Sequence, residues 1–148
     1  MPERHLYEGW LELGTKRPDR IMDPYAAQFW EFTSGEELRL QRCDACGAMR
    51  WPPAAVCDQC LSADYTWAIV TGRARLISWV TFHRQYFPEY PPPHSAITVE
   101  LEEGPLFVST VADETVDELS NGMRMELAWV EGSDRFGEFR LPVFRPAV

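Results

Sequence analysis

The chain has 148 residues, 45% of them hydrophobic and 13% aromatic, which is enough for one buried core or for one domain with a small appended module. Its 23 acidic and 14 basic residues leave a formal net charge of −9 at pH 7. Since a phosphate backbone repels such a chain, this composition disfavours nucleic-acid binding through bulk charge. The charge is also uneven, because residues 85–148 hold four arginines and twelve acidic residues. An anionic ligand would therefore be met more easily by the first half.

No segment approaches the roughly 18 consecutive apolar residues of a membrane-spanning helix. The first ten residues, MPERHLYEGW, lack the charged and then apolar pattern of a signal peptide. We therefore expect a cytoplasmic chain without membrane association.

Residues 1–37 are predicted to form an N-terminal helical arm. A short helix is expected around residues 4–13, and a clearer one lies between Asp23, a good N-cap followed by Pro24, and Gly35. Aromatic residues recur in the second helix at helical spacing and form one stripe, which includes Tyr25, Phe29 and Trp30. Such a stripe either packs on its own domain or contacts a partner protein, and the sequence leaves both possibilities open.

Residues 38–70 contain all four cysteines, as Cys43-Asp44-Ala45-Cys46, ten intervening residues and Cys57-Asp58-Gln59-Cys60. Two CxxC pairs place four thiolates around one tetrahedral metal ion, which predicts a compact zinc ribbon. Gly47 directly follows the first pair and can adopt the positive φ that a metal knuckle favours. Because the protein supplies all four ligands, no position is left for a substrate, and we expect the zinc to be structural.

Other uses of the cysteines are less well supported. Iron in a rubredoxin-like site is the main alternative, since the sulfur ligands alone do not select the metal. A disulfide framework would need an oxidising compartment, for which the chain shows no export signal. A redox CxxC motif would need no second copy and normally lies in a βαβ context that is missing here.

From residue 73 onward, within the predicted barrel domain 71–148, apolar and polar side chains alternate with the period of a β-strand. In the first segment we place Leu76, Val80 and Phe82 on one face and Ile77 and Trp79 on the other. Short strands separated by turn residues predict a small antiparallel barrel. The expected strand segments are 73–82, 95–102, 106–112, 123–129 and 139–143.

The connection from His83 to His94 contains four prolines and three aromatic residues. Proline cannot continue a strand ladder, so this segment is a long, stiff loop. Its aromatic residues either fold back onto the barrel or form an exposed binding element, and we favour the second interpretation. These residues are Tyr86, Phe87 and Tyr90.

The chain carries no recognisable catalytic motif: GxSxG, HExxH, GxGxxG and a phosphate-cradling loop are all missing from its sequence. The four cysteines are assigned to metal, and no carboxylate or nucleophile is tied by spacing to His5, His83 or His94. We therefore assign no catalytic residues. Two alternatives stay open: a zinc-ribbon and barrel protein that binds single-stranded nucleic acid, and an enzyme with a site between His83 and His94.

The order of these parts resembles a known family. A helix ending at Gly35 is followed by LQRCDACGAMRWPPAAVCDQC, then by SAITVELEEGPLFVSTVAD, NGMRMELAWVE and LPVFRPA. This looks like the acyl-CoA-associated proteins that combine an N-terminal helical arm, a rubredoxin-like zinc ribbon and an OB-fold. The resemblance covers roughly residues 20–148 and implies a mainly β fold, with the arm at 1–37, the ribbon at 38–70 and a five-stranded OB-fold barrel at 71–148.

The resemblance also implies a function that depends on a partner. Members of this family accompany thiolase-superfamily proteins or acyl-CoA hydratases, including a thiolase-like aldolase of steroid side-chain degradation. We therefore expect a non-catalytic small subunit of a hetero-oligomer that acts on acyl-CoA thioesters. A partner would be contacted by Tyr25, Phe29, Trp30, Tyr86, Phe87 and Tyr90. Phosphates of acyl-CoA would be contacted by Arg50, Arg73, Arg75 and Arg84.

Overall fold

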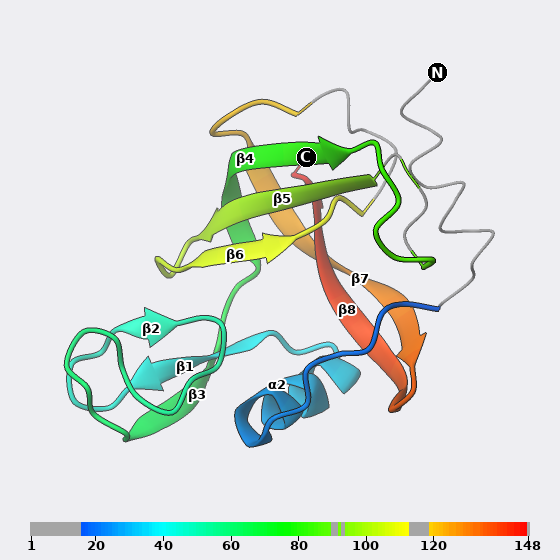
Figure 1. The fold of residues 1–148 in the computed structure, drawn as a ribbon. Helices are drawn as coiled ribbons and strands as arrows, with labels where there is room; N and C mark the ends of the chain where they lie inside the picture. The colour runs from blue at the N-terminus through cyan, green and yellow to red at the C-terminus, as the bar shows by residue number, and fades with distance from the viewer. Residues whose placement is uncertain (1–15, 90–91, 93, 113–118, 148) are drawn as a thin grey trace.

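A computed structural model describes residues 16–89, 92, 94–112 and 119–147 of the chain. The predicted helix around residues 4–13 and the predicted interface residue Tyr90 lie outside the described residues. Within them, one helix is followed by a small sheet and a larger sheet (Figure 1). The elements are α2 Pro24–Ser34, β1 Arg39–Cys43, β2 Met49–Arg50, β3 Tyr65–Ile69, β4 Arg73–Phe82, β5 His94–Leu101, β6 Leu106–Ser109, β7 Arg124–Asp134 and β8 Gly137–Pro146.

Helix α2 begins and ends where its capping residues predict. One carboxylate oxygen of Asp23 accepts hydrogen bonds from the N–H groups of Tyr25, at 3.0 Å, and Ala26, at 2.8 Å. The helix is followed by Gly35, and it buries Phe29 and Thr33. It is 11 residues long, and no described helix is long and apolar enough to cross a membrane.

The three-stranded sheet has the order β2-β1-β3 and is antiparallel throughout. Cys43 is the last residue of β1 and lies opposite Tyr65, the first residue of β3. The chain then enters β4 of the second sheet after only Val70, Thr71 and Gly72. This short connection holds the cysteine-bearing sheet close to the barrel.

The five-stranded sheet has the order β6-β5-β4-β7-β8 and curls into a nearly closed barrel. Closure occurs beyond the end of β6, where Val111 forms a parallel bridge with Phe144 of β8. The N–H of Phe144 donates to the carbonyl oxygen of Thr110 at 3.1 Å, and the carbonyl oxygen of Phe144 accepts a hydrogen bond from the N–H of Ala112 at 2.8 Å. Four antiparallel pairings with a parallel closure define the topology of an OB-fold, so the predicted mainly β fold is confirmed.

One predicted strand face is wrong. Leu76 pairs with Val99, but Ser78 pairs with Thr98, which leaves Ile77 as the extra residue of a β-bulge. A bulge shifts the alternation of side chains by one residue. Val80 is consequently 55% exposed and does not share the buried face of Leu76, which is 0% exposed.

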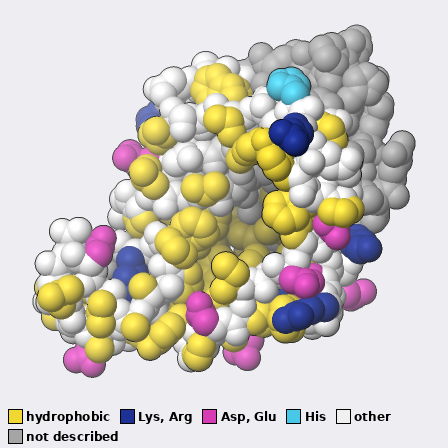
Figure 2. All heavy atoms as spheres, viewed as in Figure 1, with side chains coloured by type: hydrophobic (Ala, Val, Ile, Leu, Met, Phe, Trp, Pro, Cys, Tyr) yellow, Lys and Arg dark blue, Asp and Glu magenta, His cyan; other side chains and the backbone are white. Residues whose placement is uncertain are grey.

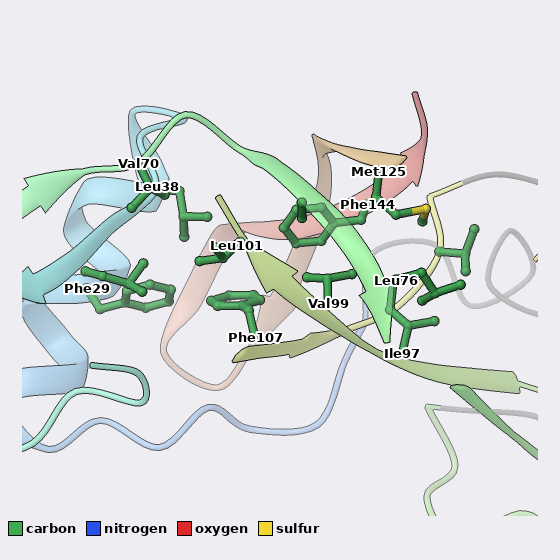
Figure 3. Close-up of a cluster of buried hydrophobic side chains, with 13 residues drawn as sticks. Phe29, Leu38, Val70, Leu76, Ile97, Val99, Leu101, Phe107, Met125 and Phe144 are labelled. Atoms are coloured by element: carbon green, nitrogen blue, oxygen red, sulfur yellow. The ribbon is translucent and has the colours of Figure 1, made fainter. Parts of the chain in front are cut away.

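A continuous hydrophobic core joins the barrel to the ribbon and the helix (Figure 3). Leu76, Val99 and Phe144 are fully buried inside the barrel. The cluster continues through Leu101 and Phe107 to residues outside the barrel, which are Phe29, Leu38, Leu40 and Val70. Helix α2 is therefore packed against this chain's own core.

A buried ion pair ties the segment before α2 to the β7–β8 hairpin. Arg20 Nε donates to Asp134 Oδ2 at 2.7 Å, and the two side chains are 8% and 0% exposed. The guanidinium carbon of Arg20 also lies 5.2 Å from the ring centroid of Trp30 and 4.2 Å from that of Phe139. These contacts orient Trp30 between the helix and β8.

Candidate metal centre and apolar groove

The four cysteine sulfurs come together at the end of β1, as their spacing predicts. All four Sγ atoms lie within 4.8 Å of one another. The Sγ atoms of Cys43 and Cys60 are 3.5 Å apart, and those of Cys46 and Cys57 are 3.6 Å apart. Each of these contacts joins the first CxxC pair to the second, so both pairs face one central point.

Both CxxC pairs are built on the same type of turn. The residue after the second cysteine donates its N–H to the carbonyl oxygen of the first cysteine at 2.9 Å, from Gly47 to Cys43 and from Leu61 to Cys57. Gly47 has φ 78°, as predicted. Leu61 occupies the equivalent position with φ 65°, which is uncommon for a side chain of this size and was not predicted.

Backbone donors stabilise one thiolate in each pair. The N–H of Cys46 has the largest effect on Cys43 and lowers the pKa of that thiol to about 6, although burial opposes it. The N–H groups of Gln59 and Cys60 lower the pKa of Cys57 in the same way. The knuckles therefore favour negative charge on the two buried sulfurs.

The other two thiols experience the opposite net effect. The N–H of Ser62 favours a thiolate at Cys60, but the neighbouring sulfur of Cys43 and burial outweigh it and raise the pKa of Cys60 to about 12. The N–H of Ala48 favours a thiolate at Cys46, yet the sulfur of Cys57 and burial raise its pKa. Four adjacent thiolates repel one another, so full ionisation of this cluster needs a cation.

The geometry of the cluster fits such a cation. A tetrahedral site with metal–sulfur bonds of about 2.3 Å separates its sulfurs by about 3.8 Å. The measured separations of 3.5 and 3.6 Å are close to that value. The residues present can therefore hold one metal ion with four thiolate ligands, and a metal held in this way would join the two knuckles.

Arg50, a predicted phosphate contact, is instead part of a buried network next to the cysteines. Its Nε donates to Gln41 Oε1 at 3.0 Å, and its Nη2 donates to the carbonyl oxygen of Ala54 at 3.2 Å. Gln41 is fully buried and also bonds both backbone groups of Ala54, at 2.7 and 3.0 Å. Arg50 is 7% exposed, so it stabilises the loop between the two knuckles and is poorly placed to meet a phosphate.

The other three predicted arginines are not brought to one place. Arg73 is paired with Glu102 at 2.8 Å, a contact that raises the pKa of Arg73 and lowers that of Glu102. Arg75 donates to the carbonyl oxygen of Gly122 at 3.1 Å. Both arginines line a charged cavity of about 620 Å³ on the barrel, whereas Arg84 lies in the loop that follows β4.

A larger and mostly apolar groove, of about 770 Å³, lies between the helix, the ribbon and the barrel. In Figure 2 it is visible as a hollow framed by hydrophobic side chains, below the barrel and above α2. Its lining comes from helix α2, from strands β4, β5, β6 and β8, from the loop that follows β2 and from the proline-rich loop. The lining residues are Phe29, Trp30, Trp51, Phe82, Tyr86, Phe87, His94, Ser95, Ala96, Phe107, Val108, Ser109, Thr110, Leu141 and Pro142.

The groove brings together the two aromatic segments that the sequence singled out. Trp30 of α2 and Tyr86 and Phe87 of the loop all line it, and the two loop residues are 62% and 52% exposed. Phe29 is only 4% exposed and belongs to the core, so it contributes to the floor of the groove. Tyr25 lies apart from the groove, with its ring centroid 6.3 Å from that of Tyr65 in the ribbon.

Several groove residues were missed by sequence reasoning. Trp51 follows β2 and places its ring centroid 4.3 Å from that of Phe107. Leu141 and Pro142 reach the groove from β8, near the far end of the chain. The aromatic character of Trp51, next to two prolines, was a usable local signal, whereas the positions of the β8 residues depend on barrel closure.

The two histidines at the ends of the proline-rich loop have different environments. His94 lines the groove and stacks on Phe82 with ring centroids 4.9 Å apart, and burial lowers its pKa. His83 is exposed. A lowered pKa keeps His94 neutral at pH 7, in agreement with its largely apolar surroundings.

The geometry defines the class of protein: a four-cysteine ribbon joined through a common core to an OB-fold barrel. Two family profiles match this arrangement, "ChsH2, rubredoxin-like zinc ribbon domain" at residues 30–66 and "ChsH2, C-terminal OB-fold domain" at residues 63–130. A solved structure titled "Ltp2-ChsH2(DUF35) aldolase" contains a similar chain, with a TM-score of 0.77 and a sequence identity of 32%. The match covers 89% of this chain and 100% of that one. The protein belongs to the ChsH2 family.

Curated relatives extend beyond this chain. A "Probable enoyl-CoA hydratase alpha subunit" of Thermomonospora curvata is 35% identical over 89% of this chain, which spans 40% of that protein. The "3-oxo-4,17-pregnadiene-20-carboxyl-CoA hydratase alpha subunit" of Mycobacterium tuberculosis is 28% identical over 79% of the chain, which spans 39% of it. The chain thus spans about two fifths of either relative. A solved structure of a DUF35 family protein from Sulfolobus solfataricus shares the fold. Its TM-score is 0.60 and its sequence identity is 11%, and the match covers 85% of this chain and 87% of that one.

Proposed function

We propose that this chain is a non-catalytic small subunit that binds and supports a thiolase-like enzyme, a thiolase or a retro-aldolase, acting on acyl-CoA thioesters. The observation that carries the proposal is the similarity to the ChsH2(DUF35) chain of the Ltp2-ChsH2 aldolase, all of which this chain covers. A relative described as a "DUF35 domain-containing scaffold protein", from Pyrococcus furiosus, gives further support to a supporting role. The named pregnadiene carboxyl-CoA hydratase subunit favours steroid side-chain degradation, and a fatty-acid pathway is the alternative.

We further propose that the four cysteines hold zinc and that this zinc is structural. The matching ribbon profile is described as a zinc ribbon, and the donor set consists of four thiolates. Such a set leaves no coordination position for a substrate. The metal would then stabilise the ribbon and would take no part in acyl transfer or carbon–carbon cleavage.

The surface proposed for the partner is the exposed aromatic end of the proline-rich loop. Tyr86 and Phe87 are 62% and 52% exposed, and aromatic side chains that are large and rigid often dominate protein interfaces. Both residues lie in the described part of the loop, a few positions after β4 ends at Phe82. Trp30 would contribute where the groove opens.

The test is to isolate the tagged chain from its own host and to identify co-purifying proteins by mass spectrometry. We expect a thiolase-superfamily protein at a fixed stoichiometry, and the recombined pair is expected to cleave an acyl-CoA thioester that neither chain cleaves alone. Replacing Tyr86 and Phe87 with alanine is expected to weaken the complex, whereas Val80→Ala, at a similarly exposed position on β4, is expected to leave it intact. A monomeric chain that instead carries single-stranded nucleic acid would refute the proposal.

A further inference from the structure

We propose that the open edge of strand β6 is a docking site for an extended segment of the partner enzyme, which adds to the barrel as a further strand. The inference rests on the proposed function in taking this partner to be a thiolase-like enzyme. It specifies which backbone groups of this chain receive the partner and what kind of segment they fit.

The hydrogen bonds of the barrel show which backbone groups of β6 face away from β5. The two strands are antiparallel, and the N–H of Leu101 donates to the carbonyl oxygen of Pro105 at 2.9 Å. Because bonded and non-bonded pairs alternate in an antiparallel ladder, every second residue counted from Pro105 bonds β5 and the residues between them do not. Leu106 and Val108 are such intervening residues, so their N–H and C=O groups point to the other side of β6.

The closure of the barrel stops before it reaches these groups because β8 carries a proline. Phe144 makes the closure through its hydrogen bonds to Thr110 and Ala112. In a parallel ladder the next donor would lie two residues earlier in β8, and its N–H would reach the carbonyl oxygen of Val108. That position holds Pro142, which has no N–H. Within the described residues no backbone hydrogen bond joins β6 itself to β8, and the two strands approach each other only near the end of β6 (Figure 1).

The unpaired groups favour a polypeptide as the occupant. In the part of the chain that the structure describes, the N–H and C=O groups of Leu106 and Val108 form no hydrogen bond. Groups on one side of a strand repeat at about 6.8 Å, which matches the repeat of donors and acceptors along another extended chain. Strand β6 has no proline, no charged side chain and no bulge, the features that commonly block the addition of a strand. This edge is therefore suited to strand addition.

The apolar groove beside the edge provides room for side chains of the added strand. Val108 lines the groove, and its floor contains Phe29 and Phe107, which are 4% and 2% exposed. Successive side chains of a strand point to opposite faces, so every second side chain of the segment would lie on this floor. Leu106 and Val108 are 51% and 52% exposed and would be covered. The edge therefore fits a segment with an apolar residue at every second position.

Charge and the neighbouring surface favour the partner enzyme over a second copy of this chain. Residues 85–148 hold twelve acidic residues and four arginines, of which Arg140 is already paired with Glu131 at 3.2 Å. Two such acidic barrels repel each other, whereas a segment with basic residues at its ends is attracted. Tyr86 and Phe87, the surface proposed for the partner, line the same groove, so one partner can contact both.

The first test measures hydrogen–deuterium exchange, resolved by fragmentation mass spectrometry, in the full metal-loaded chain alone and with the enzyme that co-purifies with it. The amides of Leu106 and Val108 are expected to exchange freely in the chain alone and at least about tenfold more slowly in the complex. The amide of Trp67, which faces the open edge of β3, is the control and is expected to change less than about twofold.

A synthetic heptapeptide tests the edge without the enzyme. It has valine at alternate positions, threonine between them and lysine at both ends, and we expect saturable binding by calorimetry with protection of the same amides. N-methylation of the central valine amide in one peptide, or of the adjacent threonine amide in another, removes one backbone donor each. Because successive amides point to opposite sides of a strand, one of the two peptides is expected to bind at least about fivefold more weakly and the other within about twofold.

Two variants at one position complete the test. Val108→Pro removes an N–H that β5 does not use and is expected to weaken heptapeptide binding at least about tenfold, whereas Val108→Thr keeps the backbone and is expected to weaken it at most about threefold. If Val108→Pro does not fold, exchange in the unmodified chain decides.

Fast exchange at Leu106 and Val108 in the presence of both enzyme and heptapeptide would overturn the inference, as would equal effects of the two N-methyl groups. Protection of these amides in the concentrated chain alone would assign the edge to a second copy and would overturn it as well. A complex that forms without this protection leaves the proposed function intact. If no enzyme co-purifies, the proposed function fails and the heptapeptide still decides the edge.

Discussion

The two neighbouring aromatic residues of α2 are expected to respond very differently to truncation, although the sequence places them in one stripe. Phe29 is 4% exposed and contacts the core shared by ribbon, helix and barrel. Trp30 is half-buried and packs against Phe139 at the edge of that core. Phe29→Ala therefore removes a core side chain, whereas Trp30→Ala removes part of a groove wall.

The magnitudes follow from this difference in burial. Truncation of a buried phenylalanine to alanine costs about 3–5 kcal/mol, through lost transfer free energy and the cavity that remains. Since a domain of this size is stable by about 5–15 kcal/mol, the Phe29→Ala variant is expected to lose about a fifth or more of its free energy of unfolding. For Trp30→Ala we expect about 1–2 kcal/mol, because much of its ring already faces the groove and its remaining neighbours can close in.

The assay is equilibrium unfolding in urea, followed by circular dichroism, with capture of the partner measured on the same preparations. Trp30→Ala is expected to fold and to weaken capture of the partner, while Phe29→Ala loses mainly stability. A loss of less than about 1 kcal/mol for Phe29→Ala would refute its place in the core. A loss from Trp30→Ala as large as that from Phe29→Ala would refute the distinction between wall and core.

Three further predictions concern the metal and the β7–β8 hairpin. Purified chain is expected to contain one zinc ion, measured by plasma mass spectrometry, and Cys57→Ser is expected to lose that ion and to unfold the ribbon, seen as lost amide dispersion in NMR. Gly132→Ala is expected to lower stability by about 1–3 kcal/mol because its Cβ would lie 2.5 Å from the Phe139 ring, while Gly35→Ala, whose nearest atom is at 3.7 Å, stays within about 1 kcal/mol. The pKa of Asp134 is lowered: burial opposes this, but hydrogen bonds from Arg20 outweigh it. Because the pKa of Asp134 is lower in the folded state, its ionised carboxylate stabilises the fold above the unfolded-state pKa of about 3.9, and this stability is lost as the pH falls through the folded-state pKa. Asp134→Asn is therefore expected to reduce the difference in unfolding free energy between pH 6 and pH 3. An unchanged difference would contradict the ion pair.

Features that depend on local residue order could be predicted from the sequence. The cap of α2 depends only on the Asp23 carboxylate, which accepts hydrogen bonds from the N–H groups two and three residues further along the chain. The metal cluster depends only on two CxxC turns that face each other. The bounds of β4 follow from a ten-residue run of strand-forming side chains. The cap and each CxxC turn span only a few residues, and the two turns are separated by a short segment, with Cys43 and Cys60 17 residues apart.

Features that depend on contacts between distant segments could not be predicted. The bulge at Ile77 involves pairing with β5 and a hydrogen bond from the side chain of Asn121 to the carbonyl oxygen of Ile77, 44 residues away in the chain. The burial of Arg50 depends on its hydrogen bond to Gln41 across the β1–β2 pair. The sequence suggested that this charged side chain is free to bind a ligand, but in the structure it is buried and hydrogen-bonded. The groove forms only where the helix, the ribbon and β8 lie next to one another, and no local sequence pattern predicts that arrangement.

The metal centre and the groove are connected through one short segment of the chain. Cys43 ends β1 only two residues after Gln41, whose side chain holds Ala54 and Arg50 in the loop between the knuckles. That loop carries Trp51, which packs on Phe107 at the groove with ring centroids 4.3 Å apart. A metal that fixes the knuckles would therefore also fix one wall of the groove, although no metal ligand lines it. Removal of the proposed zinc by a chelator is therefore expected to loosen Trp51 and this wall of the groove before the barrel itself unfolds, which Trp fluorescence and amide exchange would report separately.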